Sequence, residues 1–295
     1  MKRNNFYIII IHFIIKGKYM LKTQMWRFYF VLFTMLYLSV LGQSKNTMIV
    51  LDPASIEILY MIGAEDEILA IPDMKTIEPK EKTKKLQKVG TFTNPSIEKI
   101  LSLKPKIVIL TSYSIGLKDQ LERQKIKTMQ LPVNSLKDIQ NNIITLGDIT
   151  NKQENAKKLL DDFNDKLVQI KAMPVNKRAV FIYSATPLMV FGANTLPSDV
   201  LDAIGVDNIA KDIVGQRPIL SPEFLLKENP EVILYGLRIT DKNELINANP
   251  AFKHLNAVKN DNVYFLELHS LLRGSPNIIN EILRIKKDIF GQKTP

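Results

Sequence analysis

The chain of 295 residues contains no cysteine. This excludes disulfide bonds, thiolate metal sites, a cysteine nucleophile and a lipid-modified N-terminal cysteine. The sequence also lacks a glycine-rich phosphate loop, an HExxH helix and a G-x-S-x-G elbow. Where a dinucleotide fold would carry a glycine-rich turn after its first strand, Asp52-Pro53-Ala54-Ser55 stands instead. These absences predict a protein that is not an enzyme and has no intrinsic cofactor. An α/β enzyme is the competing hypothesis.

The net charge of +10 is spread along the chain. No basic run interleaved with aromatic residues is present, and the lysines are scattered over amphipathic stretches and turns. The pattern favours a solvated surface, and we expect no nucleic-acid partner.

Residues 1–44 read as a leader. Two apolar runs, residues 6–15 and 28–41, are each shorter than the roughly 20 residues of a spanning helix. The second run follows Lys22 and Arg27 and ends in Gly42-Gln43-Ser44, which is a secretory signal pattern. We expect a soluble periplasmic protein that is not a lipoprotein. If the leader is retained, a membrane-tethered interaction protein is the alternative.

From residue 48 onward, short apolar runs alternate with amphipathic stretches, which predicts parallel sheets covered by helices on both faces. The predicted strands are residues 48–52, 67–71, 107–111, 127–131, 179–183, 188–191, 232–235 and 263–266. The predicted helices are residues 55–62, 95–102, 116–124, 135–146, 197–204, 221–227, 242–248 and 276–290. Residues 75–88 are expected to form a connection and residues 89–94 a loop.

Residues 151–173 predict one long helix. Its apolar positions recur at the spacing of a single helix face, Asn151 can cap its start and Pro174 follows its end. The interpretation is an α/β lobe at 45–150, a linking helix at 151–173 and a second α/β lobe at 174–295. A long surface helix within one domain is the alternative.

An internal repeat favours two related lobes. Residues 96–109 align without a gap over residues 221–234, so that Ser96 matches Ser221 and Pro105 matches Pro230. Residues 58–63 likewise align over residues 200–205, and both segments end in glycine.

An ordered set of segments carries a family resemblance. In the first half these are Asp52 to Glu57 with Ile62-Gly63, Val89-Gly90 with Pro95 to Ile100, and Leu103 to Ile109; in the second half they are Ala203-Ile204-Gly205 with Asn208-Ile209-Ala210, Leu220 to Glu223, and Ser275-Pro276. The set resembles the helix-linked class of bacterial periplasmic substrate-binding proteins, which serve ABC importers of ferric siderophores, haem and cobalamin. The resemblance implies two Rossmann-like lobes joined by one long helix, with a ligand cleft between them. It also implies a monomer that delivers its cargo to a permease and ATPase complex in the inner membrane.

Three arginines fall in loops of the second half: Arg217, Arg238 and Arg273. Guanidinium groups present a planar fork to carboxylate, phosphate or catecholate oxygens, so three in one cleft would hold an anionic ligand. Three independent surface arginines are the alternative.

Two aromatic residues and one histidine complete the predicted ligand site. Phe92 stands where cobalamin-binding relatives carry a ligand-facing aromatic residue, and Tyr113 is the repeat partner of Arg238. Tyr113 or His269 could also ligate a metal; buried packing of Tyr113 and a plain loop position for His269 are the alternatives. Haem-binding members usually carry a tyrosine after Val-Gly, where this sequence has Thr91-Phe92, which argues against haem coordination by the first lobe.

The expected cargo is an anionic iron complex, either a ferric siderophore or haem. The alternatives are cobalamin, a nickel or cobalt complex, and an oxyanion such as molybdate. For docking to the permease, Glu223 matches an exposed glutamate of the cobalamin-binding members. Glu98, Asp119 and Glu122 are the candidates in the first lobe.

Overall fold

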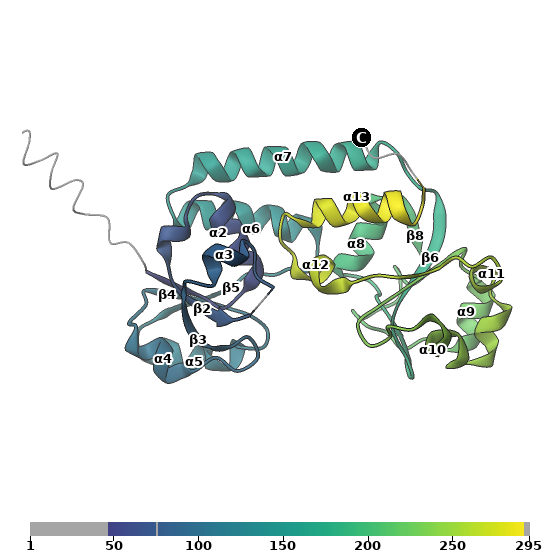
Figure 1. Cartoon of the computed structure of the whole chain (residues 1–295), viewed down its shortest axis with the longest axis horizontal. Coiled ribbons are helices and arrows are strands. Elements are labelled where there is room, and N and C mark those ends of the chain that lie inside the picture. The colour runs from purple at the N-terminus through teal and green to yellow at the C-terminus, as the bar shows by residue number, and fades with distance from the viewer. Residues whose placement is uncertain (1–46, 75, 292–295) are drawn as a thin grey trace, which may run out of the picture. The chain divides into compact units, whose positions relative to one another are not determined.

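The first half of the chain builds a parallel sheet of five strands in the order β3-β2-β1-β4-β5. The computed structural model describes residues 47–74 and 76–291, so the predicted leader lies outside it (Figure 1). The strands are β1 (Met48–Val50), β2 (Ile68–Asp73), β3 (Gln87–Thr91), β4 (Ile107–Leu110) and β5 (Lys127–Gln130). The strand order reverses between β1 and β4, and such a reversal places ligands beyond the carboxyl ends of the strands.

Helices cover both faces of this first sheet. They are α2 (Pro53–Met61), α3 (Lys80–Thr83), α4 (Ile97–Ser102), α5 (Lys118–Arg123) and α6 (Leu136–Ile149), with short 3-10 turns at Glu65–Glu67 and Ile115–Leu117. The start of α2 shows how the sequence sets a boundary: Asp52 accepts from the backbone N–H of Ser55 at 2.8 Å, and Pro53 occupies the first turn.

The second half builds another five-stranded sheet, in the order β10-β9-β6-β7 with β8 paired to β6. Its strands are β6 (Lys177–Ala185), β7 (Leu188–Val190), β8 (Val206–Asn208), β9 (Val232–Tyr235) and β10 (Val263–Phe265). All pairs are parallel except β6 with β7. Its helices are α8 (Leu196–Ala203), α9 (Pro222–Glu228), α10 (Lys242–Asn247), α11 (Asn256–Lys259), α12 (Leu268–Arg273) and α13 (Ile278–Asp288), with a 3-10 turn at Pro250–His254.

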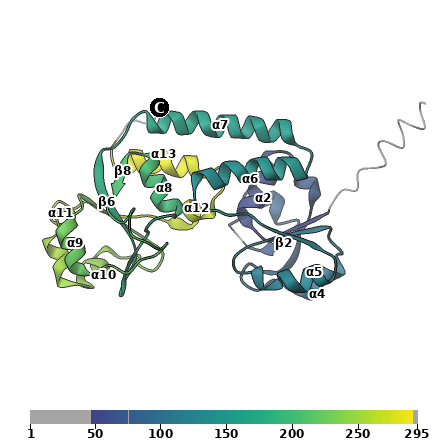
Figure 2. The same cartoon turned by 180° about the vertical axis from the view of Figure 1, so that it is seen from behind.

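The long helix α7 (Gln153–Lys171) separates the two sheets in sequence and lies beside α6 and α13 (Figures 1 and 2). The predicted cap was wrong. Asn151 has a left-handed backbone (φ 56°), and Lys152 takes the cap position without a side-chain cap bond. At the other end, the buried Lys286 of α13 donates to the carbonyl oxygens of Ile170 (2.8 Å) and Met173 (2.5 Å), and burial lowers its pKa.

A single hydrophobic core connects the two sheets. Buried residues of α6, α7, α8 and α13 join residues from both sheets, such as Val50 in β1 and Phe181 in β6. The outer faces have separate cores, one under α4 and α5 and one under α9, α10 and α11. The described residues accordingly fall in one compact unit. The long helix is therefore one of several elements that join the two halves.

The two halves of the predicted repeat share the same local structure. Ser96 and Ser221 both cap their helices through the side-chain oxygen. The residue before the matching prolines is left-handed in both copies, at Lys104 (φ 48°) and Asn229 (φ 41°). The glycines after α2 and α8 are also left-handed, at φ 67° and 71°.

The predictions missed several short elements. Residues 89–94 were predicted as a loop, but residues 87–91 form β3, an edge strand in which only Val89 is buried. A strand with one buried side chain carries little hydrophobic pattern. The three-residue β8, the four-residue α3 and α11 and the six-residue α12 are too short for a periodicity. No helix among the described residues combines the length and apolar character needed to span a bilayer.

Gly90 should not tolerate a side chain. Its φ is +106°, and an added Cβ would lie 2.7 Å from the Ser96 nitrogen and 2.8 Å from the Asn94 oxygen. Both contacts are with backbone, which cannot move aside cheaply. We expect Gly90→Ala to lower the free energy of unfolding by about 2 kcal/mol or more, measured by chemical denaturation. Gly116→Ala is the control because nothing lies within 4 Å of its added Cβ. Equal effects at both positions would contradict this account.

Candidate ligand-binding site

Two of the predicted arginines converge on one aromatic ring. The guanidinium carbon of Arg217 lies 4.6 Å from the centre of the Tyr183 ring, and that of Arg238 lies 5.5 Å from it. The two guanidinium carbons are therefore at most about 10 Å apart. Tyr183 is near the end of β6, Arg238 follows β9, and Arg217 lies in the loop between β8 and α9. The arginine–tyrosine cluster (Tyr183, Arg217, Arg238) thus combines three segments of the second half.

This cluster carries uncompensated positive charge. Within residues 47–74 and 76–291, neither Arg217 nor Arg238 forms an ion pair with an acidic side chain, and both are exposed. At such a separation the two cations repel by on the order of 1 kcal/mol near a protein surface. An anion placed between them would relieve this repulsion and accept hydrogen bonds from both guanidinium groups. The arrangement is suited to a ligand with acidic oxygens.

The sequence fixes this cluster through the fold beneath it. Tyr183 packs edge-on against Phe191, with ring centres 5.8 Å apart, and Phe191 is buried. The loop that carries Arg217 is tied along β7, because Val190 donates to the Pro218 oxygen at 3.1 Å and Leu220 donates to the Leu188 oxygen at 2.9 Å. The ring is therefore held by the buried Phe191, while both arginines that contact it are exposed.

An aromatic pair marks the first half. The rings of Phe92 and Tyr113 lie 5.2 Å apart and are tilted by 60°. Phe92 follows β3 and Tyr113 follows β4, so both belong to the carboxyl edge of the first sheet. Tyr113 is 66% exposed, so its alternative interpretation, buried packing, is wrong. A turn holds it in place, in which the Thr111 N–H donates to the Ser114 hydroxyl at 2.8 Å.

Arg273 and His269 have other surroundings than predicted. Arg273 ends α12, and its guanidinium binds the Glu57 carboxylate and the Thr76 carbonyl oxygen. It is therefore engaged within the protein and does not act as a third free cation. His269 is exposed and lies in the helix α12, where a loop was predicted. No cluster of metal-ligating side chains is present in the described part of the chain.

Two further polar groups were not singled out from the sequence. Tyr183 was missed because its alternating strand pattern gives no sign that two distant arginines meet its ring. Asp52 lies at the carboxyl end of β1, where burial raises the pKa of its carboxyl group against the lowering effect of the Ser55 hydrogen bonds. The Asp52 side chain caps α2 and accepts hydrogen bonds from the backbone N–H and the hydroxyl of Ser55, so it is already engaged within the protein.

A cavity of about 280 Å³ opens beside α2. It is lined by Glu57, Tyr60, Met61, Glu78, Pro79, Lys82 and Asn277. None of the predicted ligand-binding residues lines it, although Arg273 binds its lining residue Glu57. The cavity is therefore not the proposed ligand site.

The predicted docking residues are all exposed, and three of them lie in first turns of helices. The fourth, Glu122, lies near the end of α5 and accepts a hydrogen bond from the Thr128 hydroxyl at 2.6 Å. Glu98 begins α4, Asp119 begins α5 and Glu223 begins α9. The Glu98 backbone N–H and the Ser96 hydroxyl bond the Glu98 carboxylate and lower its pKa, which keeps it ionised. All three helices pack on the outer cores, on the side of their sheet away from α7 (Figure 1).

The family model for periplasmic binding proteins matches residues 48–268, well over half of the chain. The chain belongs to this family. Among its relatives, a vitamin B12-binding protein from Vibrio parahaemolyticus is 26% identical over 264 residues, which cover 84% of this chain and 90% of the relative. An uncharacterised ABC transporter substrate-binding lipoprotein, YvrC from Bacillus subtilis, is 27% identical over 253 residues and covers 81% and 78% of the two chains.

A solved structure shows the same fold. A possible iron-binding, periplasmic solute-binding protein from Staphylococcus epidermidis superposes with a TM-score of 0.75 at 21% identity, covering 84% of this chain and 99% of that one. These findings confirm the predicted family and the α/β fold with two parallel-type sheets. This periplasmic binding protein is a substrate-binding component of the ABC importer type and not an enzyme.

Proposed function

We propose that this protein captures an anionic iron complex, a ferric siderophore or haem, in the periplasm and delivers it to an inner-membrane permease. The observation that carries the proposal is the arginine–tyrosine cluster, in which two guanidinium groups without acidic partners lie against one aromatic ring. The Phe92–Tyr113 pair supplies aromatic surface for the ligand from the first half. Both groups lie near or beyond the carboxyl ends of strands, where open α/β sheets bind ligands.

The proposal includes the arrangement of the chain. Residues 1–44 would be a leader that is removed, residues 45–150 and 174–295 the two lobes, and residues 151–173 the linking helix. Two sheets with α7 between them in sequence support these boundaries. The ligand would bind between the lobes, with the arginine–tyrosine cluster on one side and the aromatic pair on the other, and the protein would act as a monomer.

Cobalamin is the second candidate cargo. It is favoured by the relative from Vibrio parahaemolyticus, whose name states that it binds vitamin B12. Against it stands the charge of the site, because cobalamin offers few acidic oxygens to two arginines.

Isothermal titration of the purified protein with matched chelates distinguishes these cargoes. A ferric catecholate complex, which is negatively charged, should bind more tightly than a neutral ferric hydroxamate complex of similar size, because only the former satisfies both guanidinium groups. Haemin, cyanocobalamin, a cobalt complex and molybdate complete the panel. Binding of cyanocobalamin alone would replace the iron proposal with its alternative, and preference for the neutral chelate would contradict the role of the arginines.

Reversing the charges of Glu98 and Glu223 should impair import and leave ligand binding intact. Each glutamate is exposed at the start of a repeat-related helix and can meet a basic pocket on the permease. We expect Glu98→Arg with Glu223→Arg to lower uptake at least about tenfold, since each interface charge pair contributes about 1.5 kcal/mol and the variant removes two. Uptake of labelled cargo by whole cells measures this.

A control on α7 separates docking from a general charge effect. Asp165 is exposed on the outer side of that helix, so Asp165→Arg should leave uptake unchanged. Asp119→Arg tests the other candidate in the first half. Equal loss of uptake with Asp165→Arg would contradict the docking assignment.

A further inference from the structure

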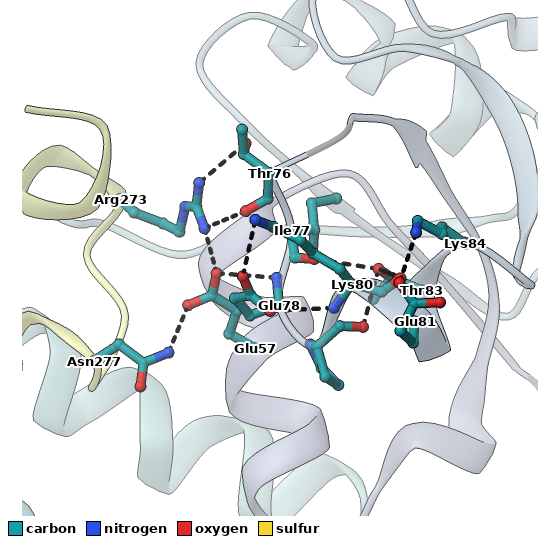
Figure 3. A network of polar contacts seen from close by, with 11 residues as sticks. Glu57, Thr76, Ile77, Glu78, Lys80, Glu81, Thr83, Lys84, Arg273 and Asn277 are labelled. Carbon is teal, nitrogen blue, oxygen red and sulfur yellow. Dashed lines mark hydrogen bonds and ion pairs between the residues drawn. The ribbon is translucent and has the colours of Figure 1, made fainter. Parts of the chain in front are cut away.

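A buried ion pair joins segments that are more than two hundred residues apart in sequence. The Arg273 guanidinium, at the end of α12, bonds a carboxylate oxygen of Glu57 in α2 at 2.5 Å. The other carboxylate oxygen accepts from the side-chain amide of Asn277 at 3.2 Å. Figure 3 shows Arg273 and Asn277 approaching Glu57 from the same side. We call Glu57, Arg273 and Asn277 the latch.

The latch is tied to the first half at two places. Besides Glu57, Arg273 bonds the carbonyl oxygen of Thr76 at 2.7 Å and its hydroxyl at 3.1 Å, and Thr76 lies just beyond the carboxyl end of β2. The neighbouring Gly274, at φ +73°, lies so close to Val133 that an added Cβ would come within 2.6 Å of the Val133 Cβ. The segment after β10 of the second sheet is thus fixed to the carboxyl edge of the first.

Burial distinguishes this pair from the others. The side chains of Arg273 and Glu57 are 12% and 2% exposed. Each of the other ion pairs in the described part of the chain leaves both side chains at least 23% exposed. Surface pairs contribute little, whereas a buried charge that loses its partner is strongly unfavourable. Among these pairs, the latch is therefore the one able to hold two parts of the fold at a fixed separation.

We propose that Glu57, Arg273 and Asn277 are positioning residues that fix the spacing between the two halves of the ligand site. These halves are the Phe92–Tyr113 pair and the arginine–tyrosine cluster, so this inference rests on the proposed function. None of the three latch residues needs to touch the ligand. They act by keeping most molecules at the spacing that can bind the ligand. The apparent affinity falls in proportion to the fraction of molecules that have this spacing.

The absence of cysteine allows a direct test. Lys85, before β3, and Lys253, in the 3-10 turn of the second half, are both exposed and can be replaced by cysteine for spin labels. Pulsed electron resonance then measures the distance between the halves without ligand. With the latch intact we expect one narrow distance distribution. In Glu57→Gln with Arg273→Met, the distribution should broaden or shift, and affinity for the cargo identified by titration should fall about tenfold.

Matched variants separate positioning from stability. Arg284→Met breaks a pair with Glu281 that lies within α13, so it should leave the distance distribution unchanged. Arg273→Lys alone keeps a positive charge beside Glu57, so its distance distribution should stay nearly as narrow as that of the original protein. Asn277→Ala removes a single bond and should give a smaller broadening, which keeps the test valid if the double variant fails to fold.

The outcomes distinguish this inference from the proposed function. If the panel shows no binding but the latch variants broaden the distribution, the proposed function fails and the latch stands. If the panel shows binding but the folded latch variants keep the original distribution and affinity, the latch is overturned.

Discussion

Replacing Arg217 and Arg238 together by alanine should weaken ligand binding at least about 100-fold. A hydrogen bond to a charged group contributes roughly 1.5–3 kcal/mol, and about 1.4 kcal/mol corresponds to a tenfold change in affinity. Both guanidinium groups lie over Tyr183 without acidic partners, so their bonding capacity is free for the ligand. Isothermal titration with the anionic chelate that the protein binds measures the loss.

The fold should be insensitive to this double substitution because both side chains are exposed. Arg178→Ala provides a matched control in the same half, since that guanidinium is occupied by Glu228 and Asp207. It should leave affinity unchanged. Tyr183→Phe should also bind normally, because it keeps the ring that supports both cations. If the double arginine variant binds as tightly as the original protein, the arginine–tyrosine cluster is not the ligand site.

Replacing Phe163 by alanine should lower the free energy of unfolding by about 3–5 kcal/mol. Phe163 lies in the middle of α7 and is 1% exposed within the core that both sheets share. Truncation removes a buried ring and leaves a cavity that packed helices on several sides cannot fill. Urea or guanidinium denaturation followed by circular dichroism measures the change.

Val168→Ala is the control on the same helix, because Val168 is 67% exposed. Its effect should stay within about 0.5 kcal/mol. Comparable losses for Phe163→Ala and Val168→Ala would mean that α7 does not take part in the shared core. The alternative of a surface helix would then gain support.

Much of the fold could be predicted from local sequence signals. The Ser96 and Ser221 caps, the prolines at 105 and 230 and the glycines at 63 and 205 each specify backbone geometry over a few residues, and the structure shows that geometry. The buried strands β1, β4 and β9 are continuous apolar runs, which identify interior parallel strands. Where a strand lies at an edge with one buried side chain, as β3 does, the signal is lost.

The site was harder to predict because its parts meet only in the folded chain. The sequence placed Arg217, Arg238 and Arg273 in similar loops, but it could not tell which guanidinium would meet a carboxylate. Glu57 decides this for Arg273, and it lies in α2, far away in sequence. Tyr183 was hidden for the converse reason, since nothing local marks a strand tyrosine as a platform for distant cations.

The shared core has a consequence for dissecting this protein. Buried residues of α6, α7, α8 and α13 belong to one core, so cutting the chain at residue 151 or 174 would expose apolar surface of both fragments to water. The repeat shows that the two halves are built alike. The shared core shows that each half also keeps water away from apolar side chains of the other. Neither half is therefore a module that could be lifted out or exchanged between relatives on its own.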